Sequence, residues 1–338
     1  MKILITGGAG FIGSHTSVEF LNKGHDVIIL DNLSNSNINV INNIPLICKL
    51  KPIFVLGDVR DEPLVEQLMI KHKPDMVVHF AALKSVSDSV IDPITYYDVN
   101  LGGLKNILIG MEKTNCKKLI FSSSATVYDL STDGLIQESH DTKPINPYGR
   151  SKLFSEMIVE DWVNANHGNM ACSLRYFNPV GAHPSALIGE QPSNTATNLM
   201  PLICAAANGD LPSLKLFGND YDTRDGSGER DYLHVCDLAE AHVVVAEKIS
   251  GMNRYQVLNI GTGVGTTVLE LINNFELVND LKIKIELAPR RLGDFGSVVA
   301  NPSLSQEVLN FYCKRSLNSM CRDSWKSYKI MRSNPQHG

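Results

Sequence analysis

The chain has 338 residues, and its 36 acidic side chains outnumber its 31 basic ones, so that the net charge at neutral pH is −5. This mild acidity predicts no nucleic-acid partner, because binding to a phosphate backbone needs a basic face. No apolar stretch approaches the roughly 18 residues of a transmembrane helix, so no membrane partner is expected. The seven cysteines form no C-x-x-C pair, and we expect free thiols in the cytoplasm and no metal site.

Short apolar runs alternate with helical patterns through the first half of the chain. The runs cover residues 3–5, 27–30, 53–56, 76–80 and 119–121, and helices are expected near 11–23, 60–72, 94–114 and 148–165. Each run is continuously hydrophobic, as expected for a parallel strand that is covered on both faces. The alternation predicts an α/β fold with a Rossmann-type doubly wound parallel sheet.

The composition changes after residue 177, where prolines and glycines become frequent and predicted strands become sparser. Because single cores stop growing near roughly 250–300 residues, we expect two packed domains or one large domain with a satellite. Residues 1–177 are predicted to form the Rossmann domain, and residues 178–338 a smaller α/β lobe over the carboxyl ends of its strands. The boundary is soft, since a helix near 236–250 and a strand near 256–260 could return to the first sheet.

A glycine-rich turn follows the first apolar run. The segment from Thr6 to Gly13 reads TGGAGFIG, which fits both G-x-G-x-x-G and G-x-x-G-x-x-G. Glycines there allow a tight turn and a close approach of backbone N–H groups to a pyrophosphate. Asp31 ends the second run 18 residues beyond Gly13, where a carboxylate accepts hydrogen bonds from an adenosine 2′-OH and repels a 2′-phosphate. The pattern therefore predicts NAD rather than NADP.

Three further positions lie at or just after the ends of the third and fourth runs. Asp58 either meets an adenine edge or caps the next helix. Phe80 precedes two alanines, which either admit a ligand close to the backbone or simply pack. Lys84 is either a phosphate partner or a solvated loop lysine. The residues alone leave each pair of alternatives open.

A tyrosine and a lysine stand four residues apart where a helix is expected to begin. With Asn146 as the cap, Tyr148 and Lys152 lie one turn apart on the same face. A phenol has a pKa near ~10, and a nearby ammonium, the helix N-terminus and an oxidised nicotinamide would each stabilise the phenolate. Tyr148 would then act as a general base near neutral pH. Ser124, after the fifth run, either bridges a substrate oxygen and Tyr148 or belongs to an ordinary serine-rich turn.

Taken together, these segments resemble the extended short-chain dehydrogenase/reductase family, and within it the epimerases that interconvert UDP-glucose and UDP-galactose. Similar stretches run from the glycine turn to residues 288–294. The resemblance implies an isomerase with a first, NAD-binding domain and a second, UDP-sugar-binding lobe. It implies that Ser124, Tyr148 and Lys152 are the catalytic trio, and that Lys152 also touches the nicotinamide ribose.

The resemblance also implies two sets of binding residues. Those that match cofactor-binding positions are Gly7, Gly10, Phe11, Ile12, Gly13, Asp31, Asn32, Asp58, Val59, Phe80, Lys84, Lys152 and Phe177. Those that match positions around the UDP-sugar are Ser124, Tyr148, Asn178, Asn198, Leu199, Phe217, Arg230, Tyr232, Val268, Arg291 and Asp294.

Three of the UDP-side residues have a plain physical rationale. Arg230 and Arg291 suit a diphosphate clamp, although Arg230 could instead pair with an adjacent carboxylate and Arg291 could be a surface charge. Phe217 either stacks on uracil or fills the core of the small lobe.

The implied reaction is a reversible inversion at C4 of a UDP-hexose through a transient 4-keto sugar. Two alternatives are a nucleotide-sugar dehydratase or decarboxylase and a non-catalytic NAD-binding regulator. The turn at Ser124 lacks the carboxylate of the dehydratases, and the regulator is disfavoured because Tyr148 and Lys152 are both present. Val298 stands where glucose- and galactose-restricted members carry a tyrosine, so N-acetylated UDP-hexoses are further expected substrates. A homodimer through the helices near 94–114 and 148–165 is also implied.

Overall fold

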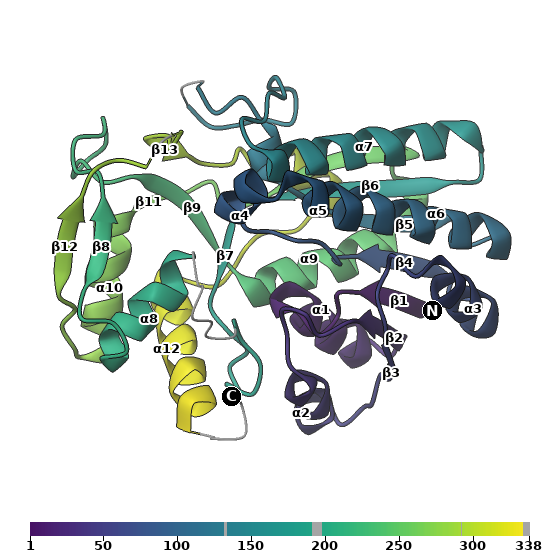
Figure 1. Ribbon diagram of the computed structural model, residues 1–338, viewed down its shortest axis with the longest axis horizontal. Coiled ribbons are helices and arrows are strands. Elements are labelled where there is room, and N and C mark those ends of the chain that lie inside the picture. Colours follow the sequence, from purple (N-terminus) through teal and green to yellow (C-terminus); the bar gives the residue numbers. More distant parts are fainter. Residues whose placement is uncertain (132–133, 191–197, 292, 334–338) are drawn as a thin grey trace.

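A seven-stranded sheet, parallel throughout, forms the centre of the larger unit of the computed structural model, which describes residues 1–131, 134–190, 198–291 and 293–333 (Figure 1). Its strand order is β10-β6-β5-β4-β1-β2-β3. The strands are β1 (Lys2–Thr6), β2 (Asp26–Asp31), β3 (Ile53–Leu56), β4 (Met76–His79), β5 (Lys118–Ser124), β6 (Met170–Tyr176) and β10 (Tyr255–Ile260). The five apolar runs of the sequence are β1 to β5, and the predicted doubly wound fold is confirmed.

Helices cover both faces of this sheet. One face carries α1 (Phe11–Asn22), α2 (Ile38–Cys48), α9 (Val235–Lys248) and α11 (Ser303–Leu309), and the other carries α3 (Glu62–His72), α6 (Gly103–Thr114) and α7 (Pro147–Ala165). Successive residues of a strand point to opposite faces. Ile3 and Ile5 accordingly lie in the core under α1, and Leu4 lies in the core under α3 and α6. This double burial explains why each run is hydrophobic without alternation.

The helix expected over 94–114 is not continuous. Short helices α4 (Val86–Ile91) and α5 (Pro93–Tyr97) lie beside α7, and a π-helical segment (Asp98–Gly102) joins α5 to α6. Asn100, inside the π segment, donates to the carbonyl of Leu83 at 3.1 Å and to Ser151 Oγ at 2.8 Å. π-helical turns tend to occur at functional sites. The wider turn lets this buried amide tie the loop after β4 to α7.

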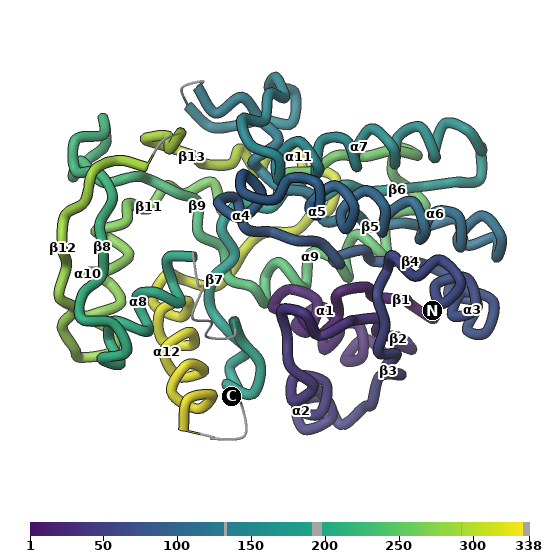
Figure 2. The backbone as a smooth tube through the Cα atoms, in the orientation of Figure 1, coloured from purple at the N-terminus to yellow at the C-terminus, as the bar shows by residue number. Residues whose placement is uncertain are grey.

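The smaller unit has its own sheets and core. Strand β9 (Glu229–His234) pairs with β7 (Asn178–Val180), β11 (Gly265–Thr267) and β13 (Ser297–Val298), and β8 (Leu214–Phe217) pairs with β12 (Ile285–Ala288). Helices α8 (Leu199–Asn208), α10 (Val268–Asn279) and α12 (Leu317–Ser333) enclose a core around Phe275. Figure 2 shows this lobe beside the large sheet, reached directly from β6 through β7.

The chain crosses between the two units more than once. After β9, α9 packs on α1, and β10 pairs in parallel with β6, so both belong to the larger unit although they follow residue 177. The division into residues 1–177 and 178–338 stays a prediction. Among the helices of the described residues, none has the length and apolarity to cross a membrane.

Candidate active site

The glycine turn between β1 and α1 is fixed by steric limits. Gly7 has φ of +68°, and a Cβ there would lie 2.7 Å from the amide nitrogen of Ala81. A Cβ at Gly13 would lie 2.3 Å from the carbonyl oxygen of Gly7, so Gly13 serves close packing of α1 on the turn. Gly10 caps α1 without a side-chain hydrogen bond, which leaves the first N–H groups, at Phe11 and Ile12, free for an anion. The cradle fits the pyrophosphate of a dinucleotide.

Asp31 joins the glycine turn to the end of β2. Its carboxylate is buried and accepts hydrogen bonds from the amide of Ala9 at 2.9 Å, the amide of Leu33 at 2.8 Å and Ser36 Oγ at 3.1 Å. Three donors from the protein fix the position of the carboxylate at the carboxyl end of β2, where the sequence predicted a ribose contact.

Asp58 follows β3 and forms a polar cluster with Asn32. Asn32 Nδ2 donates to Asp58 at 2.9 Å, and the Arg60 side chain donates to both oxygens of the same carboxylate. These hydrogen bonds hold the pKa of Asp58 well below its ordinary value. The alternative role of Asp58 as a helix cap is wrong, because Asp61 caps α3 by accepting the amide of Leu64.

The apolar side chains of the predicted cofactor set pack where strands end. Val59 is buried against Gly103, Phe80 lies with its ring centroid 4.9 Å from that of His242, and Phe177 is buried after β6. They give the predicted cofactor pocket rigid apolar walls.

Lys84 and Asn198 meet at a residue that the sequence did not single out. Glu190 Oε1 accepts from Lys84 Nζ at 3.1 Å and from Asn198 Nδ2 at 2.6 Å. Lys84 follows β4 of the large unit and Asn198 caps α8 of the lobe, so the carboxylate links a predicted cofactor residue to a predicted substrate residue. The partners of Glu190 lie 106 and 8 positions away, and one sequence contains no signal for such a pairing.

Ser124, Tyr148 and Lys152 are brought together at the carboxyl end of β5. Asn146 caps α7 by accepting the amide of Gly149 at 2.8 Å, as expected. A Cβ at Gly149 would lie 2.6 Å from the carbonyl oxygen of Thr126, so the glycine lets α7 touch the turn after Ser124. The Tyr148 side chain hydrogen-bonds Ser124, and the ammonium of Lys152 lies 6.0 Å from the centroid of the Tyr148 ring.

Burial dominates the electrostatics of this trio. It raises the pKa of Tyr148 to about 12, although the hydrogen bond with Ser124 acts in the opposite direction. Burial also lowers the pKa of Lys152 to about 7. Lys152 Nζ donates to the carbonyl oxygen of Ser122 at 2.7 Å. Without a bound cofactor, loss of hydration thus outweighs the hydrogen bond from Ser124. The expected acidification of Tyr148 by the lysine, the helix N-terminus and an oxidised nicotinamide together stays a prediction.

The predicted UDP-side residues gather in the lobe. Asn178 and Tyr232 are register partners in β7 and β9, while Leu199 and Val268 begin α8 and α10. Arg230 pairs with Asp294, another predicted ligand residue, and not with an adjacent carboxylate; its role as a diphosphate clamp stays a prediction. The Arg291 guanidinium lies 4.1 Å from the centroid of the Phe217 ring. Both arginines are thus held in place by residues of the same predicted set.

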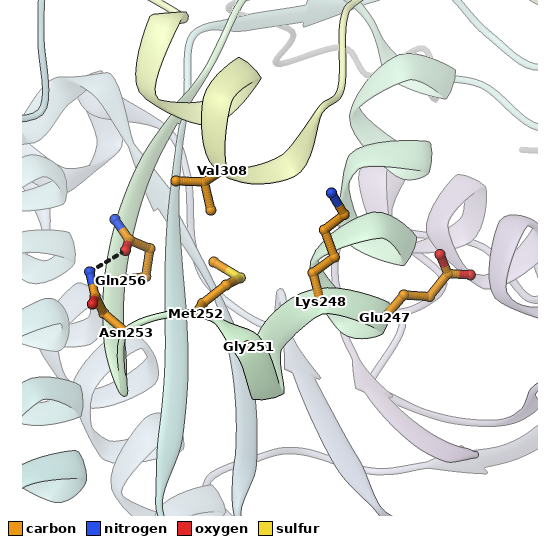
Figure 3. Close-up of a pocket in the computed structure, with 7 residues that line it drawn as sticks. All are labelled: Glu247, Lys248, Gly251, Met252, Asn253, Gln256 and Val308. Carbon is orange, nitrogen blue, oxygen red and sulfur yellow. Dashed lines mark hydrogen bonds between the residues drawn. The ribbon is translucent and has the colours of Figure 1, made fainter.

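A surface cavity of about 550 Å³ lies away from these residues (Figure 3). It is lined by the end of α9, the start of β10 and Val308 of α11, and Asn253 bonds Gln256 at its wall at 2.9 Å. The start of β10 is at the amino edge of the parallel sheet, opposite the edge that carries the trio. None of the predicted site residues lines this cavity.

The fold and the site define a dinucleotide-binding enzyme with the tyrosine–lysine pair of the short-chain dehydrogenases/reductases. Residues 3–261 match the model of the NAD dependent epimerase/dehydratase family, and the chain belongs to this family.

Curated relatives and solved structures are similar to this protein over nearly the whole chain. The UDP-glucose 4-epimerase of Yersinia enterocolitica is 46% identical over 331 residues, which are 98% of each chain. The crystal structure of UDP-glucose 4-epimerase from Bifidobacterium longum with NAD+ and UDP is 42% identical, with a TM-score of 0.94 and 100% of both chains covered. The UDP-Glc/GlcNAc 4-epimerase of Campylobacter jejuni is 36% identical, with a TM-score of 0.85 over 97% of this chain and 99% of that one. The predictions of an epimerase-type enzyme and of NAD as cofactor are confirmed.

The packing role of Gly13 is open to a direct test. Gly13→Ala should weaken NAD binding at least tenfold and lower Tm, because the added methyl group collides with the turn that forms the cradle. Isothermal titration with NAD and a thermal melt measure both effects. Gly251→Ala is the control, since nothing lies within 4 Å of its Cβ position. An unchanged NAD affinity in Gly13→Ala would contradict the assignment of the cradle.

Proposed function

We propose that the chain interconverts UDP-hexoses epimeric at C4, with NAD as the resident cofactor and Tyr148 as the acid/base. The observation that carries this proposal is the half-buried Tyr148 side chain, hydrogen-bonded by Ser124 and one helical turn from the buried Lys152 at the carboxyl edge of the sheet. The family and its UDP-glucose 4-epimerase relatives support the same reaction.

Each member of the trio has a distinct task. Tyr148 removes the proton of the sugar 4′-OH and returns it to the epimeric product. Ser124 hydrogen-bonds Tyr148 and orients the substrate oxygen. Lys152 contributes positive charge beside the phenol, which favours the phenolate. NAD held at the glycine cradle would supply reversible hydride chemistry at C4, so the reaction would have no net oxidation or reduction.

The lobe residues hold the nucleotide part of the substrate. Arg230 and Arg291 face a diphosphate as rigid donors, and Asp294 positions Arg230 through their ion pair. Binding energy concentrated on UDP leaves the hexose free to present either face of C4 to the cofactor. A dehydratase is disfavoured because the turn Ser124-Ala125-Thr126 offers no carboxylate to eliminate water.

Replacement of the base tests the mechanism. Tyr148→Phe should lower kcat for UDP-galactose at least a thousandfold while leaving the Kd of UDP within threefold, because the change removes one hydroxyl at the reacting atom. UDP-glucose formation, followed by chromatography without added cofactor, measures the rate. Tyr312→Phe, an exposed tyrosine, is the matched control. Equal rates in Tyr148→Phe and the parent would exclude Tyr148 as the base.

We further propose that N-acetylated UDP-hexoses are substrates. Val298 is buried on β13 and pairs in register with Arg230 of β9, which places it beside the predicted UDP-side residues. Valine leaves more room than the tyrosine of glucose-restricted members of the family, and an acetamido group at C2 needs such room.

A larger side chain at position 298 should affect the turnover of N-acetylated and plain UDP-hexoses differently. Val298→Tyr should reduce kcat/KM for UDP-GlcNAc at least tenfold and change that for UDP-glucose less than threefold. A substrate panel assayed in parallel measures both, with Val264→Tyr, at an exposed position, as the control. Equal losses on both substrates would refute the size argument.

The proposed biological unit is a cytoplasmic homodimer. Exposed apolar side chains gather on neighbouring helices, with Val90 and Ile91 on α4, Ile94 on α5 and Met157 on α7. A second copy would remove this surface from water. The seven cysteines are free thiols, in keeping with a reducing compartment.

Charge introduced on this surface tests the dimer. The double substitution Ile94→Glu/Met157→Glu should convert a dimer to a monomer in light scattering coupled to size exclusion, because two carboxylates per copy would be buried in the interface. Leu277→Glu, on the exposed side of α10, should leave the mass unchanged. A dimer that persists in the double variant would place the interface elsewhere.

A further inference from the structure

A third ionisable side chain lies on the face of α7 that carries the catalytic pair. Tyr148, Lys152 and Glu156 are spaced by four residues, so they lie one above another on the helix. The Glu156 side chain is only 5% exposed. A buried carboxylate next to a buried ammonium affects the protonation of that ammonium strongly, because water does not screen the interaction.

The carboxylate of Glu156 is held by three bonds. Arg175 of β6 donates through Nε to Oε1 at 2.9 Å and through Nη2 to Oε2 at 2.6 Å, and Ser123 Oγ donates to Oε1 at 2.5 Å. The guanidinium is itself only 6% exposed and lies 4.6 Å from the centroid of the Tyr128 ring. Ser123 and Arg175 are register partners in β5 and β6. The ion pair is therefore built rigidly into the sheet directly behind the trio.

Stability alone does not account for such a pair. Buried ion pairs are replaced by apolar residues at little or no cost in many proteins, since desolvation offsets the attraction. Here the pair changes the charge around Lys152. Glu156 alone would neutralise Lys152, whereas with Arg175 the three groups carry a net charge of +1 when Lys152 is protonated.

We propose that the Glu156–Arg175 ion pair is a positioning element for catalysis, which sets the charge of Lys152 and, through it, the proton affinity of Tyr148. The proposal rests on the proposed function only in assigning Tyr148 and Lys152 as the catalytic pair. Glu156 favours the ammonium form of Lys152, and Arg175 keeps the site net positive, as a phenolate requires.

The protonation of Lys152 is sensitive to this pair. Burial lowers its pKa to about 7 while the charge of Glu156 acts in the opposite direction. A group with a pKa near 7 changes charge in the physiological range, so a neighbouring unit charge alters its occupancy by large factors.

Other titratable groups face the same helix, and their states bear on the test. His79 of β4 is neutral in the working range, because burial and Lys152 lower its pKa to about 3. The phenols have pKa values raised by burial and stay protonated near neutral pH. They are Tyr96 of α5, Tyr128 after β5, Tyr176 of β6 and Tyr255 of β10. Glu138, whose backbone carbonyl accepts from Arg175 at 3.4 Å, is a further nearby carboxyl, and burial raises its pKa.

Removal of the Glu156 charge and removal of the Arg175 charge should shift the pKa values of Lys152 and Tyr148 in opposite directions. Glu156→Gln removes a negative charge, which lowers the pKa of Lys152 and of Tyr148 and moves both limbs of the kcat–pH profile to lower pH. Arg175→Met removes a positive charge and moves both limbs to higher pH. The double variant Glu156→Gln/Arg175→Met removes both charges and should return towards the parent. Each single shift is expected to be about one pH unit.

The experiment measures the pKa of Lys152 directly in NAD-loaded protein. Lysines labelled with carbon-13 at Cε are titrated by NMR, the Lys152 signal is assigned with Lys152→Met, and the kcat–pH profile is recorded on the same variants. Glu160→Gln, which changes an exposed carboxylate one turn further along α7, is the charge-matched control. It should shift neither the pKa of Lys152 nor the kcat–pH profile.

The outcomes separate this inference from the proposed function. Downward shifts of the Lys152 pKa in Glu156→Gln, reversed in the double variant, support the inference even if UDP-hexoses are not turned over. An unchanged Lys152 pKa in folded Glu156→Gln overturns it, even if epimerase activity is intact. Should Arg175→Met not fold, Glu156→Gln and the double variant still show in which direction the pKa of Lys152 shifts.

Discussion

The polar face of α7 must leave water when the helix packs on β5, and the site follows from how that burial is satisfied. Three consecutive serines at the end of β5 each serve one of the three ionisable side chains on this face. The carbonyl of Ser122 accepts from Lys152, the hydroxyl of Ser123 donates to Glu156, and Ser124 hydrogen-bonds Tyr148. Unsatisfied polar groups at this depth would each cost about 1–3 kcal/mol. The serine run is thus the complement of the helix rather than an ordinary turn.

The two units contribute to the site by different means. The large unit offers mainly backbone, with the glycine cradle, a fixed Asp31 carboxylate and apolar walls. The lobe offers charges, and one of them, Arg230, already has a protein partner in Asp294. Glu190 crosses between the units by bonding Lys84 and Asn198. A diphosphate bound as proposed would exchange partners with a carboxylate, which would reduce the net electrostatic gain and favour a ligand that fits the whole set.

The sequence predicted the fold class and the strands β1 to β5, because continuous apolar runs and the glycine turn depend on local rules. The start of α7 at Pro147 was equally local, since Asn146, a proline and the i, i+4 pair lie within one short segment. The break at Asp98–Gly102 was not visible, because it depends on Asn100 reaching Leu83 and Ser151. The same holds for Glu190 and for Arg175, whose partners are set by tertiary packing. The sequence indicated which kinds of residue were present and how they were spaced, but tertiary packing determines which of them are in contact.

The acidity of Tyr148 shows where local reasoning reached its limit. A cation one turn away lowers the pKa of an exposed phenol, yet burial raises that of Tyr148 to about 12 and lowers that of Lys152 to about 7. The same loss of water makes both groups respond more strongly to any further charge, because the effective dielectric around them is low. A nearby positive charge therefore favours the phenolate of Tyr148 more strongly here than it would in water. The net charge of the Lys152, Glu156 and Arg175 group then decides how far a ligand has to shift Tyr148 before it can take a proton.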